Sequence, residues 1–350
     1  DGVRDITKVI RNAAVNDDAA TDWAGASTFN ACPEYTGRPV GDPYVLDKFN
    51  GDMWATQVVY GLPAGTYIVS AATRGQVGSY SHIYINQDPY QAPDLATVAT
   101  DDLGDDVSAG TLGYGFSRKS ATFTITETKN ILLGFYVQSI TNMWASCDDW
   151  HMYRIESVSA TISDAGYATF SSSYALDLTE ANTPSGLTTY YVKKSDLTAT
   201  SAPFTTINQT VAAGQGILFK GAAGTYNIKV AASGTALADN ALVATDGSAI
   251  DAGNYVFAYE TENPSTTAGF YYVSEATDPV AAGKAYLDPT TLSVKALYIP
   301  FNGTATGVEA VEAAEAEAEA GGVIYNLNGQ VVTKDYKGIV IKSGKKYFNK

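Results

Sequence analysis

The chain has 350 residues and a formal net charge of −15, and only 17% of its residues are charged. That length is enough for two ordinary domains, and the low content of Glu, Lys and Arg disfavours long exposed helices. The acidic balance disfavours a nucleic-acid partner, and no apolar run is long enough to span a membrane. We therefore expect an all-β protein.

Segments that alternate apolar and polar residues run through the first block, residues 1–156. They are GTYIVSAATRG (65–75), HIYIN (82–86), ATFTITE (121–127) and ILLGFYV (131–137). The period of two and the flanking turn formers predict β-strands. Residues 87–115 have many turn formers and little periodicity, so they predict a long loop, and such loops in compact domains tend to be functional.

The run WASCDDWHMYRI, residues 144–155, combines a thiol, two carboxylates and one of the two histidines. No motif of a serine hydrolase, a P-loop or a zinc protease accompanies it, so we interpret it as a closing strand. Its alternation predicts that Trp150 and Met152 share one face with Trp144. Cys147, within the run, and Cys32 form either one disulfide or two buried thiols.

A second block, residues 157–303, has the same β character. Its turn-punctuated segments include TTYYVKK, QGILFKG, GTYNIKV, NYVFAYE, GFYYVSE and ALYIPF. This spacing predicts a second β-sandwich. Residues 304–322 are almost entirely Ala, Glu and Gly, which predicts an acidic linker. Residues 323–350 return to strand patterning and predict a small C-terminal β domain.

Three regions resemble secreted proteins of the Bacteroidetes phylum. DITKVIRNAAV, MWATQVVYGLPAGTYIVSAATRG and MWASCDDWHMYRI resemble galactose-binding-like jelly rolls, which are carbohydrate-binding-module-like domains. The chain departs from their pattern at AAVNDDAATDW and at Cys147, where an apolar aromatic residue is usual. The second block, with AGYATFSSSYALDL, is similar to an uncharacterised β-domain. The tail VIYNLNGQVVTKDYKGIVIKSGKKYFNK looks like C-terminal domains that direct type IX secretion.

This resemblance implies a jelly roll in the first block and a protein that is secreted or displayed on the outer cell surface. Together with the strand spacing of the second block, it leads us to expect two jelly-roll-like β-sandwiches. The first residue is Asp1 rather than Met, and we expect a mature form whose leader has been removed.

Aromatic residues are concentrated in the first block, which holds all four tryptophans and ten of the 24 tyrosines. An exposed aromatic face can stack on a pyranose while polar groups bind its hydroxyls. Trp23 and Trp150 lie in the frame of the first and last strands, so we assign them to the core. The predicted carbohydrate-binding residues lie in or beside loops: Tyr44, Trp54, Tyr90 and Tyr114.

The resemblance also implies a structural Ca²⁺ between the first and last strands. Calcium takes six to eight oxygen ligands, which Asp5, Asp148 and Asp149 could begin to supply. The alternative is that these carboxylates face water at an edge or a bulge. A second acidic cluster, DDLGDD (101–106), is interpreted as a solvated loop.

The predicted function is non-catalytic glycan recognition by the first domain, with the second domain as a spacer or scaffold. The alternative is a structural or adhesive surface protein that contacts other proteins. A glycoside hydrolase is the least favoured reading, because the chain lacks the long α/β repeats of a barrel enzyme. Such an enzyme would need two carboxylates that face each other across a cleft about 5–10 Å wide.

Overall fold

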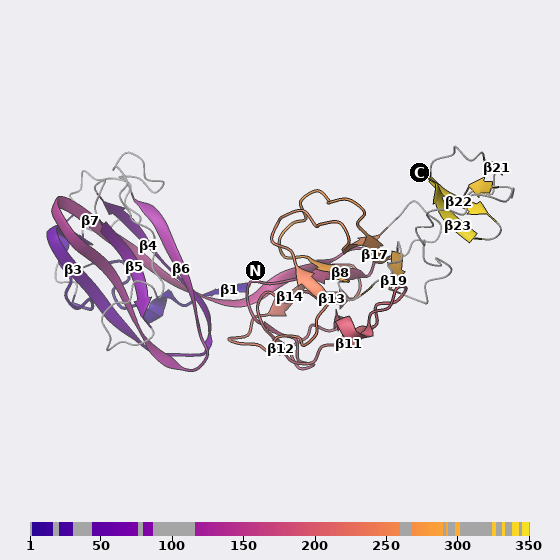
Figure 1. Cartoon of the computed structure of the whole chain (residues 1–350). Helices are drawn as coiled ribbons and strands as arrows, with labels where there is room; N and C mark the ends of the chain where they lie inside the picture. Colours follow the sequence, from indigo (N-terminus) through magenta and orange to yellow (C-terminus); the bar gives the residue numbers. More distant parts are fainter. Residues whose placement is uncertain are drawn as a thin grey trace. The chain divides into compact units, whose positions relative to one another are not determined.

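The structure is a computed structural model of the whole chain. It describes residues 2–16, 21–30, 44–75, 80–86, 116–259, 268–289, 292 and 298–301, together with four short strands between residues 324 and 349. Within these ranges the regular structure consists of β-strands and two short 3-10 helices, η1 (Thr7–Val9) and η2 (Lys194–Asp196). The prediction of an all-β fold is confirmed (Figure 1).

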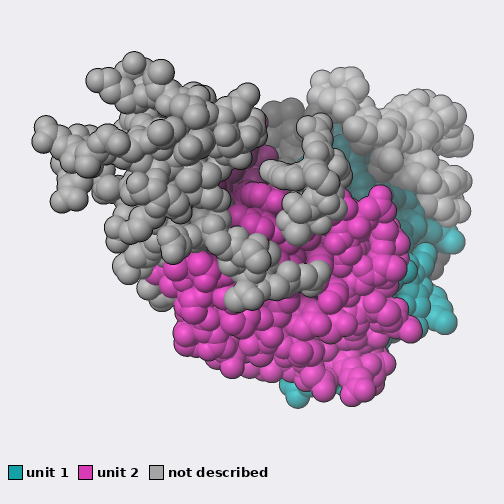
Figure 2. All heavy atoms as spheres, turned by 90° about the vertical axis from the view of Figure 1, so that its right-hand side faces the viewer, with its two compact units in different colours: residues 1–159, 174–177, 227–234 teal, residues 160–173, 178–226, 235–350 magenta. Residues whose placement is uncertain are grey.

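The chain divides into two compact units, which Figure 2 colours separately. Unit 1 comprises residues 1–159, 174–177 and 227–234, and unit 2 comprises residues 160–173, 178–226 and 235–350. The finer division at residues 156, 303 and 322 stays a prediction. The Ala/Glu linker, residues 304–322, lies outside the described residues.

An eight-stranded sheet dominates the N-terminal part of the chain, and its main path runs β2-β3-β7-β4-β6. The strands β1, β5 and β14 also pair with β7. The bounds are β1 Gly2–Asp5, β2 Thr28–Asn30, β3 Tyr44–Leu62, β4 Gly65–Gly75, β5 Tyr80–Asn86, β6 Ser117–Ile125, β7 Lys129–Ile162 and β14 Gly224–Lys229.

The long strand β7 organises this sheet, because it has different neighbours along its length. Its first part, from Lys129 to Gln138, lies between β3 and β5, and all three are antiparallel. Further along, β4 replaces β5, and Ala145 to Ile155 pair with residues 66–75. The predicted segment GTYIVSAATRG has the same bounds as β4, so its alternation did mark a strand.

The core of unit 1 is built from the side chains on one face of each strand. On β3 these are Met53, Ala55 and Val59, and on β7 they include Leu133 and Phe135. Trp23 and Trp150 also lie in this core, with ring centroids 4.9 Å apart. The assignment of these two tryptophans to the core is confirmed.

The predicted face of Trp144 is wrong, and a bulge is the reason. The register between β4 and β7 shifts between the pairs Ser70–His151 and Ala72–Asp148. Asp149 lies at this shift with a φ of 47°. The extra residue reverses the alternation, so Ala145 and Cys147 point into the core before the bulge and Trp150 and Met152 after it. Trp144 therefore lies on the outer face.

Further sheets follow along the chain. They are a four-stranded sheet in the order β11-β10-β13-β8, a two-stranded sheet β12-β9 and a five-stranded sheet in the order β15-β18-β16-β17-β19. The bounds are β8 Tyr167–Phe170, β9 Leu176–Asp177, β10 Thr188–Val192, β11 Phe204–Thr206, β12 Thr210–Val211, β13 Ile217–Lys220, β15 Leu242–Ala244, β16 Tyr255–Tyr259, β17 Ala268–Tyr272, β18 Ala285–Leu287 and β19 Tyr298–Pro300.

The core of unit 2 joins the four-stranded and the five-stranded sheets. Tyr167 and Leu218 come from the first sheet, and Tyr255, Phe270 and Leu287 from the second. Two sheets that share one apolar core have the architecture of a sandwich.

The C-terminal segment contains a four-stranded antiparallel sheet in the order β21-β20-β22-β23. The bounds are β20 Ile324–Asn326, β21 Val331–Val332, β22 Gly338–Lys342 and β23 Lys345–Asn349. Among the described residues of the chain, no helix has the length and apolar character needed to cross a membrane.

Candidate functional site

The outer face of β3, β7 and β5 carries a set of aromatic side chains in adjacent register. Trp54 on β3 is opposite Tyr136 on β7, which is opposite His82 on β5. In the next row of the same face, Gly134 of β7 lies opposite Tyr84 of β5. Because residues opposite each other on one face of a sheet contact directly, three strands bring these side chains together. We call Trp54, Tyr136, His82 and Tyr84 the aromatic face.

Ring contacts hold Trp54 in a defined orientation. Its ring centroid is 5.4 Å from that of Tyr136, with an interplanar angle of 73°. Tyr136 in turn lies 5.6 Å from His82. Tyr136 and His82 are buried, whereas Trp54 is 44% exposed. An edge-to-face contact with a buried ring is a favourable aromatic geometry, so the exposed indole has a fixed support.

Tyr84 adds a buried polar atom to this face. Its phenol lies over Gly134, where a Cβ atom would come within 2.6 Å of the phenol oxygen. The hydroxyl has no hydrogen-bond partner in the described part of the chain, although the residue is fully buried. Burial, with Tyr136 beside it, raises the pKa of Tyr84, so the phenol stays protonated and can donate a hydrogen bond. A buried hydroxyl left unpaired costs free energy.

The four predicted carbohydrate-binding residues have different outcomes. Trp54 lies on the aromatic face and is exposed. Tyr44 is half-buried and packs against the core of unit 1. Tyr90 and Tyr114 lie outside the described residues. Carbohydrate binding by these four stays a prediction.

Sequence reasoning missed Tyr136, His82 and Tyr84. The segments ILLGFYV and HIYIN were recognised as strands, but their pairing was unknown. Alternation contained part of the signal, because in HIYIN the positions of His82 and Tyr84 alternate with the core residues Ile83 and Ile85. Only the antiparallel register brings those positions beside Trp54.

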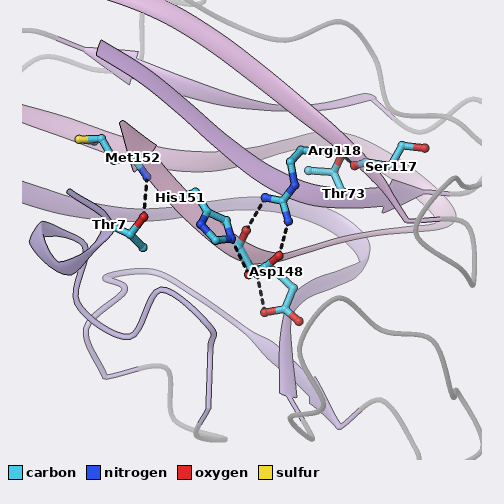
Figure 3. Close-up of polar contacts among 8 residues, drawn as sticks. Thr7, Thr73, Ser117, Arg118, Asp148, His151 and Met152 are labelled. Atoms are coloured by element: carbon cyan, nitrogen blue, oxygen red, sulfur yellow. Dashed lines mark hydrogen bonds and ion pairs between the residues drawn. The ribbon is translucent and has the colours of Figure 1, made fainter. Parts of the chain in front are cut away.

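The predicted acidic residues lie near the bulge of β7. The carboxylate of Asp149 forms an ion pair with Arg118 and contacts His151 Nε2 at 3.0 Å. Arg118 also donates a hydrogen bond to the Asp149 carbonyl oxygen at 2.9 Å. Arg118 comes from β6 and His151 from β7, and Figure 3 shows both side chains close to Asp148 at the bulge. The charge of Asp149 is therefore offset by Arg118.

Asp148 and Asp5 have other partners. Asp148 is fully buried, and its Oδ1 accepts a hydrogen bond from the Asp149 backbone N–H at 2.7 Å. Asp5 is exposed, and a hydrogen bond from the Thr7 backbone N–H, 2.8 Å long, lowers the pKa of its carboxyl. Thr7 Oγ1 also accepts a hydrogen bond from Met152 N (Figure 3), which fastens the N-terminal segment to β7.

These contacts bear on the calcium prediction. Within the described ranges, no three His, Cys, Asp or Glu side chains form a group that could hold a metal ion. The predicted ligands Asp5, Asp148 and Asp149 thus form no such group by themselves, and Asp149 is already engaged by Arg118 and His151. Calcium binding through additional carbonyl ligands stays a prediction.

A second polar cluster lies on the outer face where β3, β7 and β4 run side by side. Asp47, Ser146 and Arg74 are opposite one another in register. The Arg74 guanidinium lies 4.5 Å from the centre of the Phe116 ring and 5.2 Å from that of Trp144. Burial raises the pKa of Asp47, although a 2.6 Å hydrogen bond from Ser146 Oγ and the charge of Arg74 oppose this change.

The state of Cys147 excludes a disulfide between Cys32 and Cys147, one of the two alternatives that the sequence left open. Cys147 is a free thiol and fully buried in the core. Burial, together with the nearby Asp148 charge, raises the pKa of this thiol well above its usual range. The residue is therefore an unreactive core side chain. Cys32 lies outside the described residues.

Comparisons with known proteins give no family assignment. No family model matches the chain, and no curated protein matches it. Among solved structures, the carbohydrate-binding module TmCBM61 in complex with β-1,4-galactotriose is 17% identical over 42% of this chain and 98% of that chain, with a TM-score of 0.30.

Two further solved structures show similar levels of likeness. A cyclase from Fischerella sp. TAU is 12% identical over 44% of this chain and 98% of its own, with a TM-score of 0.28. A putative sugar-binding protein from Bacteroides thetaiotaomicron VPI-5482 is 10% identical over 40% of this chain and 86% of its own, with a TM-score of 0.25. At these identities and scores, the candidate site has to be judged on its own geometry.

Proposed function

We propose that unit 1 binds carbohydrate without catalysis, at the aromatic face around Trp54, in a protein that is secreted or displayed at the cell surface. The observation that carries this proposal is the exposed indole of Trp54, supported edge-on by the buried Tyr136. The apolar face of a pyranose can stack on such an indole. His82 and Tyr84 are buried, so they would support the aromatic face from within and would not contact the sugar themselves.

The composition of the face supports binding rather than hydrolysis. Its three rows contain Trp54, Tyr136 and His82, then Thr56, Gly134 and Tyr84, then Val58, Leu132 and Asn86. None of these side chains is a carboxylate, whereas glycoside hydrolysis requires a pair of them about 5–10 Å apart. Aromatic, hydroxyl and amide groups are the donors and stacking surfaces that recognition of a sugar uses.

Binding of the full chain to a glycan array tests this proposal. We expect selective binding that falls at least tenfold when Trp54→Ala removes the stacking surface. Val3→Ala is the matched control, because Val3 is also an exposed large apolar residue but lies on β1. An array on which the folded protein binds no glycan would reject the proposal and favour the alternative of an adhesive or structural role.

Three accessory roles complete the proposal. Unit 2 would act as a spacer or scaffold, the C-terminal segment would direct export, and a calcium ion would stabilise unit 1. Support for them is the resemblance of the sequence to secreted proteins, and deletion of residues 323–350 in the native host would test the export role. Retained export would contradict it.

A further inference from the structure

The exposed large apolar residues of the described chain are unevenly distributed. They are Val3, Phe49, Trp54 and Tyr60, with exposures of 46%, 60%, 44% and 70%. The last three are aromatic, and all three lie on the single strand β3. Isolated exposed apolar residues are normal, but three aromatic side chains on one strand indicate a surface with a common ligand.

The three aromatic side chains lie on the same outer side of β3. Met53, Ala55 and Val59 point into the core, so the alternating positions of Trp54 and Tyr60 point away from it. Before the irregular register near Gly51, Leu46 points into the core. Phe49, three positions later, therefore points outward, opposite Trp144 on β7. We call Phe49, Trp54 and Tyr60 the β3 row.

The length of the β3 row sets the size of its ligand. Trp54 lies five positions after Phe49 and Tyr60 lies six positions after Trp54, which at the rise of a strand correspond to roughly 16 and 20 Å. Irregular register at Gly51 shortens the first interval somewhat. Neither a monosaccharide nor a disaccharide can contact two members of the row. A ligand that uses the whole row must be extended.

The charges near the β3 row indicate the chemistry of that ligand. The acidic residues around Phe49 are Asp47 and the exposed Asp52, and the basic ones are Lys48 and Arg74. The row therefore offers no local excess of positive charge to a polyanion. The whole chain carries a formal charge of −15. A polyanionic chain would therefore be repelled, whereas a neutral sugar chain would stack on the aromatic rings without this penalty.

We propose that the ligand of unit 1 is a neutral, linear polysaccharide that lies along β3. Trp54 binds the central sugar units, and Phe49 and Tyr60 bind units further along the same chain in each direction. This inference rests on the proposed function and adds to it the class of ligand and the direction in which it lies. A protein that binds chain ends or single sugars would need only the surroundings of Trp54.

Titration calorimetry of the full chain tests the inference. The probes are neutral β-1,4-linked gluco-, manno-, galacto- and xylo-oligosaccharides, each from the disaccharide to oligomers long enough to span the row, with polygalacturonate as the anionic comparator. For the series that binds, we expect affinity to rise with length until the row is covered. Polygalacturonate should bind at least tenfold more weakly than the neutral polymer.

Three variants separate the members of the row. Phe49→Ala and Tyr60→Ala should each weaken binding of the long oligosaccharide by roughly three- to tenfold, the scale of one aromatic contact. Both should leave binding of a short oligosaccharide unchanged. Trp54→Ala should weaken both, and Val3→Ala should weaken neither. All four positions are exposed, so the variants should fold, and circular dichroism would check this.

The outcomes distinguish the two levels of the proposal. Binding that does not depend on length, or that is insensitive to Phe49→Ala and Tyr60→Ala, would overturn the extended ligand while leaving carbohydrate binding at Trp54 intact. Preferred binding of polygalacturonate would overturn the neutral ligand. Binding of no oligosaccharide or glycan by the folded protein would overturn the proposed function itself.

Discussion

The two units use aromatic side chains in different ways. In unit 2 they converge on the interior, where the Phe301 ring lies 5.0 Å from Tyr167, 5.2 Å from Phe204, 5.3 Å from Phe257 and 4.8 Å from Phe270. In unit 1 one set of aromatic residues fills the core, and a second set lies on the outer face of β3, β7 and β5. Among the residues whose side-chain exposure is described, a set that does not include strands β20–β23, the exposed large apolar residues all belong to unit 1.

This difference shows that aromatic content alone does not indicate a binding surface. A ring that is buried between two sheets stabilises the fold through the apolar area that it removes from water. A ring on the outer face has that area available for a ligand, and the cost of leaving it in water is recovered only on binding. Truncation of a core ring should therefore lower stability, whereas truncation of a ring on the outer face should weaken ligand binding.

The largest expected effect is the loss of stability when a core ring is removed. Phe270 is fully buried in unit 2, so Phe270→Ala should lower the free energy of unfolding by about 3–5 kcal/mol. Trp54→Ala, with its side chain on the surface, should cost less than about 1 kcal/mol. Calorimetric melting that resolves the two units would measure both. Equal costs for the two variants would remove the distinction between the units.

Overpacking beneath the aromatic face should have the next largest effect. In Gly134→Ala the new Cβ would come within 2.6 Å of the Tyr84 ring and 2.8 Å of the Ala55 carbonyl oxygen. Because neither a buried ring nor backbone moves freely, we expect a cost of about 1–3 kcal/mol together with weaker glycan binding. Thr122→Ala, at an exposed position on β6, is the control and should change neither. If Gly134→Ala changed neither stability nor glycan binding, the close packing of the Tyr84 ring over Gly134 would be contradicted.

Asp47 should produce a smaller, pH-dependent effect. Its folded-state pKa is raised above the ordinary 3.8 by burial, so the folded state holds a proton that the unfolded state has lost. Stability should therefore fall as pH rises through this window. The Asp47→Asn variant should not show this decrease in stability. Urea unfolding of both proteins, repeated at pH values from about 4 to neutral, would measure the difference. Identical pH profiles for the protein and the variant would show that this part of the outer face is well solvated.

The smallest expected effect concerns the predicted calcium ion. Arg118 and His151 already contact Asp149, so a calcium ion bound by Asp149 would have to compete with them. We expect a chelator to lower the melting temperature of unit 1 only slightly, and added Ca²⁺ to restore it. A melting temperature that is unchanged by chelator would exclude a stabilising calcium ion. A large decrease would show that a metal replaces the contacts of Asp149 with Arg118 and His151 at the bulge.

Much of the fold follows from local pattern. The strand GTYIVSAATRG was predicted with its correct ends, because period-two alternation bounded by glycines is a property of neighbouring residues. The placement of Trp23 and Trp150 in the core also follows from their position in strands. The pattern failed at Trp144, because the bulge at Asp149 depends on how β7 pairs with β4.

The sequence by itself determined the all-β class, most strands and the presence of aromatic residues suited to sugars. Only the tertiary structure decided that Trp54, Tyr136 and His82 form one row and that Phe49 and Tyr60 extend the surface along β3. The physical reason is that strand register is set by long-range pairing. The partners in these strands range from Asn86 with Leu132, 46 positions apart, to Leu46 with Cys147, 101 positions apart. Local alternation specifies which face a side chain takes, but not which side chain lies opposite it.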